Sequence, residues 1–311
     1  MKLNHFQDNT NVIGLLYALA AFSFWGLMPL YWKLLSQVSA WEIFLHRVFW
    51  TFVFVAIPLF LKGQRDVLKH ALASKQNRLA VIVSALMLSA TWFTYVWGVN
   101  TNQILETSMG YYINPLVSIL LGLIVLRERL NFWQYIAVLL AATGVLIMIA
   151  RYGRIPWIAL ILAGSFGVYG LLKKTIQIDS WTGLGIETSV IAPICLGVIL
   201  LKYVQRTGEF GTSTLATTVL LMGAGLVTAF PLLCFAQAAK RIPLSRVGFV
   251  QYLAPTISLI LGVLVFQEPF TSTHMWSFGC IWTALLIYSV SETSVMKNLQ
   301  PAWPIVSGRV R

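Results

Sequence analysis

Residues recur along this chain at a constant interval, which constrains its fold more than any other feature. The interval is 140 positions, the difference between 112 and 252 for example. The recurring pairs are Trp41 and Trp181, Tyr112 and Tyr252, Pro115 and Pro255, Ser118 and Ser258, Gly122 and Gly262, Glu128 and Glu268, and Thr143 and Thr283. An interval kept over most of a chain predicts one structural unit used twice. We expect a first repeat over residues 1–150 and a second over residues 151–311.

The composition places both repeats in a lipid bilayer. Hydrophobic residues make up 58% of the chain and charged residues 10%, against about 25% charged in soluble domains. Apolar segments of roughly 20 residues match the hydrocarbon thickness of a bilayer. The sequence has ten such segments, at 12–32, 41–61, 79–98, 104–126, 132–150, 155–172, 183–201, 216–238, 244–266 and 273–290. We therefore predict an all-α membrane protein with ten transmembrane helices.

The basic residues predict the orientation. The net charge is +12, which in a soluble chain would suggest a nucleic-acid partner. With the amino terminus in the cytoplasm, however, 16 of the 22 Lys and Arg residues fall on the cytoplasmic side, five on the opposite side and Arg47 within a segment. This asymmetry follows the positive-inside rule. It predicts both termini, with a short tail, in the cytoplasm and no nucleic-acid partner.

Ten segments divide into five and five, and an odd number reverses direction across the membrane. The second repeat is therefore predicted to enter the bilayer from the side opposite to the first. Inverted repeats are related by a pseudo-two-fold axis in the membrane plane, and the site between them can be reached alternately from each face.

Several short motifs add a family resemblance. They are Phe24-Trp25-Gly26, His46-Arg47-Val48, Leu105-Glu106-Thr107-Ser108, the stretch 110–116, Ile186-Glu187-Thr188, the stretch 231–235 and the stretch 248–252. With them the chain resembles the drug/metabolite transporter superfamily, in its EamA-type branch of ten-span, two-repeat proteins. The resemblance implies a bacterial inner-membrane permease, usually an exporter, for a metabolite, an amino acid or a drug.

Two ionisable residues are predicted to carry transport. Arg47 and Glu187 lie well inside apolar segments, where charge is costly, and they are 140 positions apart. We expect them to face a central cavity and to interact directly or through water or substrate. A structural salt bridge between the two repeats is the alternative. Glu187 is also the expected residue for a coupled proton.

Aromatic and amide side chains near mid-segment or beside the repeated prolines complete the predicted site. They are Trp25, Trp92, Tyr112, Asn114, Gln251 and Tyr252. Core packing is the alternative for each of them. Pro115 and Pro255 are expected to bend their helices, because proline removes a backbone hydrogen bond. The neighbouring small residues at 118 and 122 and their repeats predict close helix packing between the two halves.

Three further acidic residues lie at segment ends. We expect Glu128 and Glu268 to be solvated helix termini. Glu106 is expected either to cap its own helix or to gate entry.

The sequence predicts a secondary transporter that works by alternating access. No phosphate-binding loop of the form G-x-x-x-x-G-K-[ST] occurs, so an ion gradient, exchange or the substrate's own gradient must drive transport. The four histidines are scattered and the three cysteines fall in apolar segments, so we expect no enzyme, no metal site and no cofactor. The expected partners are the bilayer, a small-molecule substrate and a coupled proton. The alternative is a non-transporting scaffold or sensor subunit.

Overall fold

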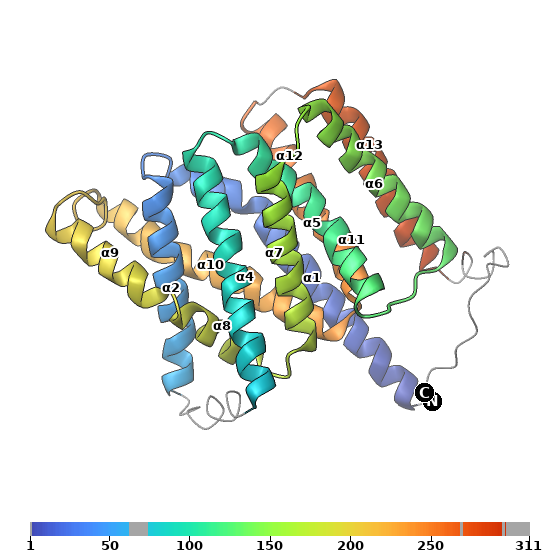
Figure 1. Cartoon of the computed structure of the whole chain (residues 1–311), viewed down its shortest axis with the longest axis horizontal. Helices are drawn as coiled ribbons and strands as arrows, with labels where there is room; N and C mark the ends of the chain where they lie inside the picture. Colours follow the sequence, from blue (N-terminus) through green and yellow to red (C-terminus); the bar gives the residue numbers. More distant parts are fainter. Residues whose placement is uncertain (1, 62–73, 268–269, 294–295, 297–311) are drawn as a thin grey trace.

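The computed structural model describes residues 2–61, 74–267, 270–293 and 296, with only the backbone given for 2–8 and 100, and throughout these ranges the secondary structure is helical (Figure 1). The helices are α1 (Lys2–Leu34), α2 (Ala40–Leu61), α4 (Lys75–Asn100), α5 (Ile104–Ile124), α6 (Phe132–Tyr152), α7 (Trp157–Thr175), α8 (Ser180–Ser189), α9 (Ala192–Val204), α10 (Leu215–Arg241), α11 (Leu244–Gln251), α12 (Leu253–Leu264) and α13 (Ser272–Ser291). Glu268 and most of the expected carboxyl-terminal tail lie outside the described residues.

Most of these helices are long and apolar enough to cross a bilayer. Eight described segments qualify: α1 from Asn9, α2, α4, α5, α6, α7, α10 and the continuous stretch Leu244–Leu264. The pair α8 and α9 makes a ninth if its two helices, bent by 51°, form one span. The described chain is thus a multi-pass helical membrane protein with eight or nine candidate spans, fewer than the ten predicted. The predicted segment that is not among these spans is 273–290, which corresponds to α13.

Two predicted continuous segments are each broken into two helices. The first breaks between α8 and α9, where Pro193 occupies the opening turn of α9. The second breaks at Tyr252. In a regular helix the carbonyl of the preceding residue, Gln251, would accept from the N–H of residue 255, and Pro255 has none. The equivalent proline of the first repeat, Pro115, lies inside α5, which continues through it as one helix. Equal residues at equivalent positions therefore have different backbone structure in the two repeats.

The contacts between helices come in pairs, and the two contacts of a pair are related by the sequence repeat. The 140-residue interval relates α1 to α7, α2 to α8 and α9, α4 to α10, and α5 to α11 and α12. Accordingly α1 packs on α10 while α7 packs on α4, and α5 packs on α7 while α12 packs on α1. The final helices of the repeats, α6 and α13, pack on each other at one edge of the molecule (Figure 1). This arrangement is what two related halves would produce.

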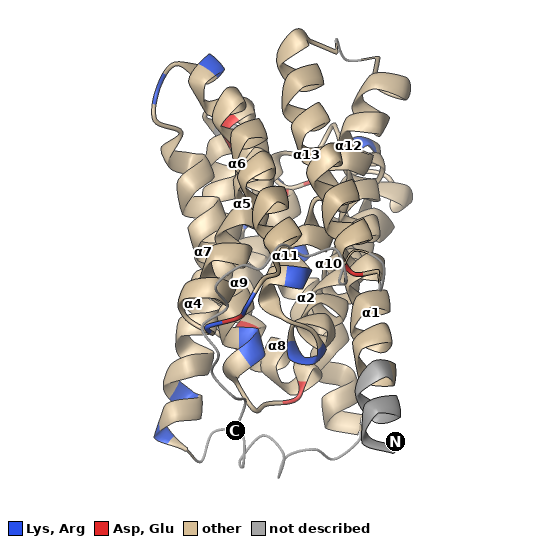
Figure 2. Ribbon diagram, turned by 90° about the vertical axis from the view of Figure 1, so that its right-hand side faces the viewer, with Lys and Arg blue, Asp and Glu red and all other residues tan. Residues whose placement is uncertain are grey.

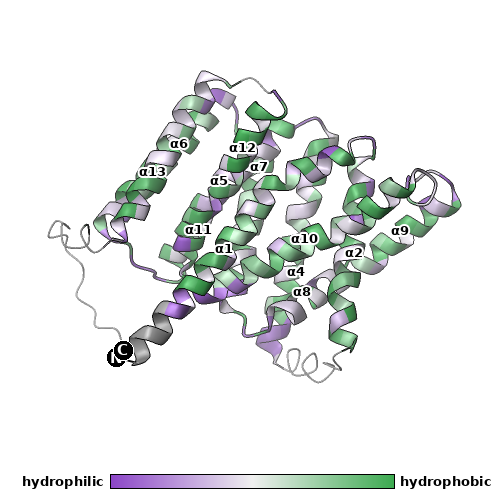
Figure 3. Cartoon of the chain, turned by 180° about the vertical axis from the view of Figure 1, so that it is seen from behind, coloured by the Kyte–Doolittle hydropathy of each residue, from purple (hydrophilic) through white to green (hydrophobic). Residues whose placement is uncertain are grey.

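Charged residues concentrate towards the helix ends and loops (Figure 2). Apolar residues cover much of the helix surfaces between them (Figure 3). Exposed leucines such as Leu139, Leu146 and Leu200 are 54–64% accessible. Large exposed apolar surfaces on a soluble protein would be unfavourable, whereas on a transmembrane bundle they face lipid.

The backbones of the two halves approach each other closely where α11 crosses α5. A Cβ atom on Gly248 would lie 2.7 Å from the Pro115 carbonyl oxygen, so only glycine fits without a shift. Ser118 Oγ, in the same part of α5, donates a 3.2 Å hydrogen bond to Gln251 Oε1 of α11. Gly122 also lies against α11, with a notional Cβ 2.9 Å from the Ser245 backbone nitrogen. These contacts agree with the predicted packing of small repeated residues between the halves.

Candidate functional site

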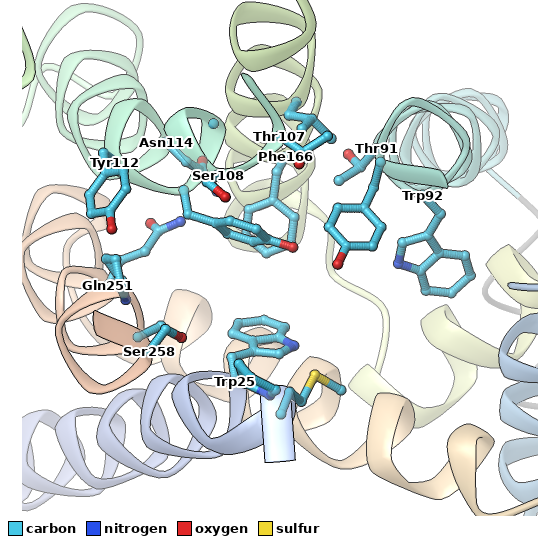
Figure 4. Close-up of a pocket in the computed structure, with 18 of the residues that line it drawn as sticks. Trp25, Thr91, Trp92, Thr107, Ser108, Tyr112, Asn114, Phe166, Gln251 and Ser258 are labelled. Atoms are coloured by element: carbon cyan, nitrogen blue, oxygen red, sulfur yellow. The ribbon is translucent and has the colours of Figure 1, made fainter. Parts of the chain in front are cut away.

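A cavity of about 300 Å³ lies between the two repeats (Figure 4). Helices α1, α2, α4 and α5 of the first repeat contribute to its wall, and so do α7, α10, α11 and α12 of the second. Six of the eight predicted transport residues line it: Trp25, Arg47, Trp92, Tyr112, Asn114 and Gln251. Residues from both halves of the chain therefore line one cavity.

Arg47 is the charged residue of this cavity. Among the described residues that line it, no other carries a formal charge. Its Nε donates a 2.9 Å hydrogen bond to Thr228 Oγ1 on α10. Its guanidinium carbon lies 5.6 Å from the Trp32 ring centre and 5.4 Å from that of Trp92. Neither the hydroxyl nor the ring faces neutralise the cation, although both favour its position.

No ion pair joins Arg47 to an acidic residue within the part of the chain that the structure describes. A cation in a low-dielectric cavity without a carboxylate is costly unless water or a ligand compensates it. A negatively charged group in the cavity would therefore be stabilised by Arg47.

Aromatic rings form much of the remaining wall. The Trp25 ring packs against Phe22 at 5.4 Å and against Phe166 at 5.6 Å between ring centres. Tyr95 and Tyr111, which also line the cavity, pack at 6.3 Å between ring centres. These contacts hold large flat side chains in place, and such surfaces bind apolar groups without large losses of side-chain entropy.

Two amide side chains lie across the cavity from Trp92 (Figure 4). The Asn114 side chain is buried, and its Oδ1 has no hydrogen-bond partner among the described residues. Gln251 accepts from Ser118 through Oε1, and in Figure 4 its side chain extends from α11 towards the cavity. Buried polar atoms without a partner are rare in proteins. Asn114 therefore offers an unused hydrogen-bonding position at this end of the site.

The structure does not bring Glu187 to Arg47, which corrects the predicted interaction. Glu187 Oε1 lies 2.6 Å from Lys173 Nζ and 2.6 Å from Ser84 Oγ, and Tyr169 donates to Oε2 at 3.4 Å. The Glu187 carboxylate is buried and does not line the cavity. In the sequence, Lys173 directly follows the apolar segment 155–172. Its long side chain turns inward from the last turn of α7 to a buried position.

Tyr252 also lies away from the cavity. Its side chain is fully buried among α5, α11 and α13 neighbours, in a cluster with Ile119, Phe249 and Ile281. It therefore packs, as the alternative interpretation held. Conversely, Trp32 and Met28 line the cavity, and neither was among the predicted site residues.

The expectation that Glu128 is a solvated helix terminus is wrong. Its Oε1 accepts from the Leu244 backbone N–H at 2.6 Å, and its Oε2 accepts from the N–H and the hydroxyl of Ser245 at 2.8 and 2.6 Å. The carboxylate of the first repeat thus caps the amino terminus of α11 in the second repeat.

Glu106 has a similar role at another helix. It accepts from the Ile158 N–H at 3.0 Å and from the Tyr152 hydroxyl at 2.6 Å. It therefore caps α7 and not its own helix, with Arg154 3.4 Å away as an ion-pair partner. The motif spacing contained no signal for either contact, because each depends on which helix end lies next to the carboxylate.

Comparisons with known proteins agree with this architecture. A crystal structure that is 15% identical in sequence has the same fold, with a TM-score of 0.69 over 94% of this chain and 99% of that one. An "Uncharacterized transporter YojE" from Bacillus subtilis is 48% identical, covering 90% of this chain and 94% of its own length. A "Protein RarD" from Escherichia coli is 41% identical, covering 88% and 93%.

The EamA-like transporter family matches the chain twice, over residues 12–150 and again over 155–290. The double match accounts for the constant interval in the sequence and for the paired helix contacts in the fold. This chain belongs to the EamA-like transporter family.

Proposed function

We propose that this protein is a secondary transporter of a small organic molecule, such as a metabolite, an amino acid or a drug. In this proposal ten spans form two inverted five-helix repeats, residues 1–150 and 151–311. The pairs α8–α9 and α11–α12 each make one broken span, and α13 makes the tenth. The paired helix contacts and the double family match support this topology. Broken helices beside a site between repeats are typical of secondary transporters.

One observation carries the proposal: a single cavity with an unpaired cation and aromatic walls lies where the two repeats meet. A site between two rigid halves can be exposed to one side and then the other when the halves rock. A scaffold or sensor subunit would have no need of such a chamber. Because both halves contribute lining residues, their relative movement would open and close it.

The helix ends support an orientation with both termini in the cytoplasm of a bacterial inner membrane. Basic residues gather at the end of the bundle where α4 begins and where α7 and α10 finish (Figure 2). That end is the cytoplasmic one by the positive-inside rule. Cavity residues Trp32, Val99 and Ile104 lie at helix ends on the other side. The structure then corresponds to a state directed outward, and we take export as the direction of transport in line with the family resemblance.

On the cytoplasmic side, contacts between the repeats close the path. Phe22 of the first repeat packs against Phe235 of the second at 6.1 Å between ring centres, and Phe166 and Tyr169 pack on the same Phe235 ring. The Phe22–Phe235 contact and the Glu128 cap join the two repeats, so both must separate in the inward-directed state.

Reconstitution into proteoliposomes tests the proposal. Vesicles with the purified full chain should accumulate or release members of a panel of labelled amino acids, metabolites and amphipathic drugs faster than empty vesicles. Arg47→Gln should reduce the flux, whereas Arg151→Gln, at an exposed position, should not. A protonophore added to the same assay tests the expected proton coupling through Glu187. A chain that is folded and moves no member of a broad panel would favour the scaffold alternative.

A further inference from the structure

We propose that the cavity selects small organic monoanions, whose carboxylate or similar group binds Arg47 and whose flat apolar body lies between the aromatic walls. The inference rests on the proposed transport function, which it refines by naming the substrate class. Its basis is the balance of charge in the cavity, together with the position of the rings and amides.

The charge balance favours one negative charge. Among the described residues that line the cavity, Arg47 carries the formal charge. The side chains that contact its guanidinium, Thr228, Trp32 and Trp92, are neutral. Nε is occupied by Thr228, so the terminal nitrogens of the guanidinium are the donors left for a ligand. A guanidinium presents paired N–H groups that match the two oxygens of a carboxylate. A dianion would leave one charge without a partner in a low-dielectric site.

The residues that line the cavity also disfavour ligands with a positively charged group. No Asp or Glu occurs among the described residues that line the cavity. An ammonium group would therefore have only ring faces and amides as partners, in a chamber that already holds one cation. Cations, and to a lesser degree zwitterions, should bind more weakly than anions of the same shape.

The walls and the volume define the rest of the ligand. A chamber of about 300 Å³ is at the small end of the range for ligand sites. Trp25 and Phe166 offer flat apolar surface on one side, and Tyr95 offers it on another. Across from Trp92, the unpartnered Asn114 Oδ1 can accept a hydrogen bond from the far end of a ligand.

A matched series of probes tests the inference on the purified full chain. 3-Phenylpropionate, its neutral amide, 2-phenylethylammonium, phenylalanine and phenylsuccinate share one apolar body and differ in charge. Affinity is measured by ligand-induced thermal stabilisation, and flux is measured in proteoliposomes. We expect the monoanion to bind about 10- to 100-fold more tightly than the amide, the range for one hydrogen-bonded charge. The ammonium, the zwitterion and the dianion should all be weaker than the monoanion.

Variants assign the selectivity to Arg47. Arg47→Gln should bind the monoanion and the amide equally, whereas Arg47→Lys should keep part of the preference. Arg151→Gln, which removes an exposed arginine from the end of α6, should behave as wild type. If Arg47→Gln does not fold, the wild-type probe series and Arg47→Lys still decide the matter.

The outcomes separate this inference from the transport proposal. Flux of the amide or the ammonium at the rate of the monoanion would overturn the inference while transport stands. Tight, Arg47-dependent binding of the monoanion without flux of any probe would support the ligand class and refute transport. Equal affinity across the series, no binding of any probe, or an anion preference that survives in Arg47→Gln would overturn the inference.

Discussion

The Glu128 carboxylate offers the most direct test of how the two repeats are held together. It accepts from three donors at the start of α11, at 2.6–2.8 Å. Glu128→Gln keeps the shape but leaves one acceptor oxygen and no charge, so at least one backbone N–H loses its partner. Hydrogen bonds to a charged group contribute about 1.5–3 kcal/mol each, against about 1 kcal/mol for neutral ones. We expect the contact to weaken by about 2–4 kcal/mol in total.

This contact joins the loop between α5 and α6 of the first repeat to the start of α11 in the second. Its loss should therefore favour any state in which these helix ends separate, by a factor of about 30 to 1,000 at 1.4 kcal/mol per tenfold change. Hydrogen–deuterium exchange followed by mass spectrometry should show faster exchange at the amides of Leu244 and Ser245. In proteoliposomes the balance between the two directions of flux should shift.

Ser245→Ala is the graded control, because it removes only the hydroxyl donor and leaves both backbone hydrogen bonds. It should weaken the contact by about 1.5 kcal/mol, the low end for one hydrogen bond to a charged group, and exchange should rise correspondingly less. The reasoning would be refuted if Glu128→Gln exchanged at the wild-type rate, or if Ser245→Ala had the larger effect.

Three further predictions follow from the packing. Lys173→Met should lower unfolding stability by about 3–5 kcal/mol, because it leaves the buried Glu187 carboxylate without its 2.6 Å partner, and the double variant Lys173→Met/Glu187→Leu should recover much of the loss in thermal unfolding. Gly248→Ala should reduce the melting temperature since its Cβ would lie 2.7 Å from the Pro115 carbonyl oxygen, whereas Gly279→Ala, with no atom within 4 Å of its notional Cβ, should be neutral or slightly stabilising. Trp25→Ala should raise the half-saturating concentration in flux assays by about tenfold or more, because it removes ring surface from the cavity wall; unchanged saturation would exclude Trp25 from ligand contact.

The sequence determined the class of this fold because a bilayer accepts few solutions. Segments without water must satisfy their own backbone hydrogen bonds, so long apolar segments predict helices. The interval between Trp41 and Trp181, or between Pro115 and Pro255, likewise predicts a duplication without any coordinates. The same reasoning identified Arg47 as a candidate functional residue, because a charged side chain inside an apolar segment is energetically costly.

Local pattern could not decide how the repeated residues would behave. Pro115 and Pro255 occupy equivalent positions, yet α5 is continuous whereas the second repeat breaks at Tyr252. A proline removes one backbone hydrogen bond in either case. Whether the helix then bends or breaks depends on the neighbours that pack around it, and those neighbours differ between the repeats.

Only the tertiary structure determined which groups the charged side chains pair with. Glu187 pairs with Lys173 because α7 and α8 bring a flexible four-carbon chain within reach, while Arg47 is left to the cavity. Glu128 caps a helix that begins more than 100 residues later in the sequence. Burial of an apolar segment is a property of its composition, but an ion pair or a cap requires two groups a few ångströms apart. That distance is fixed only when the helices have packed.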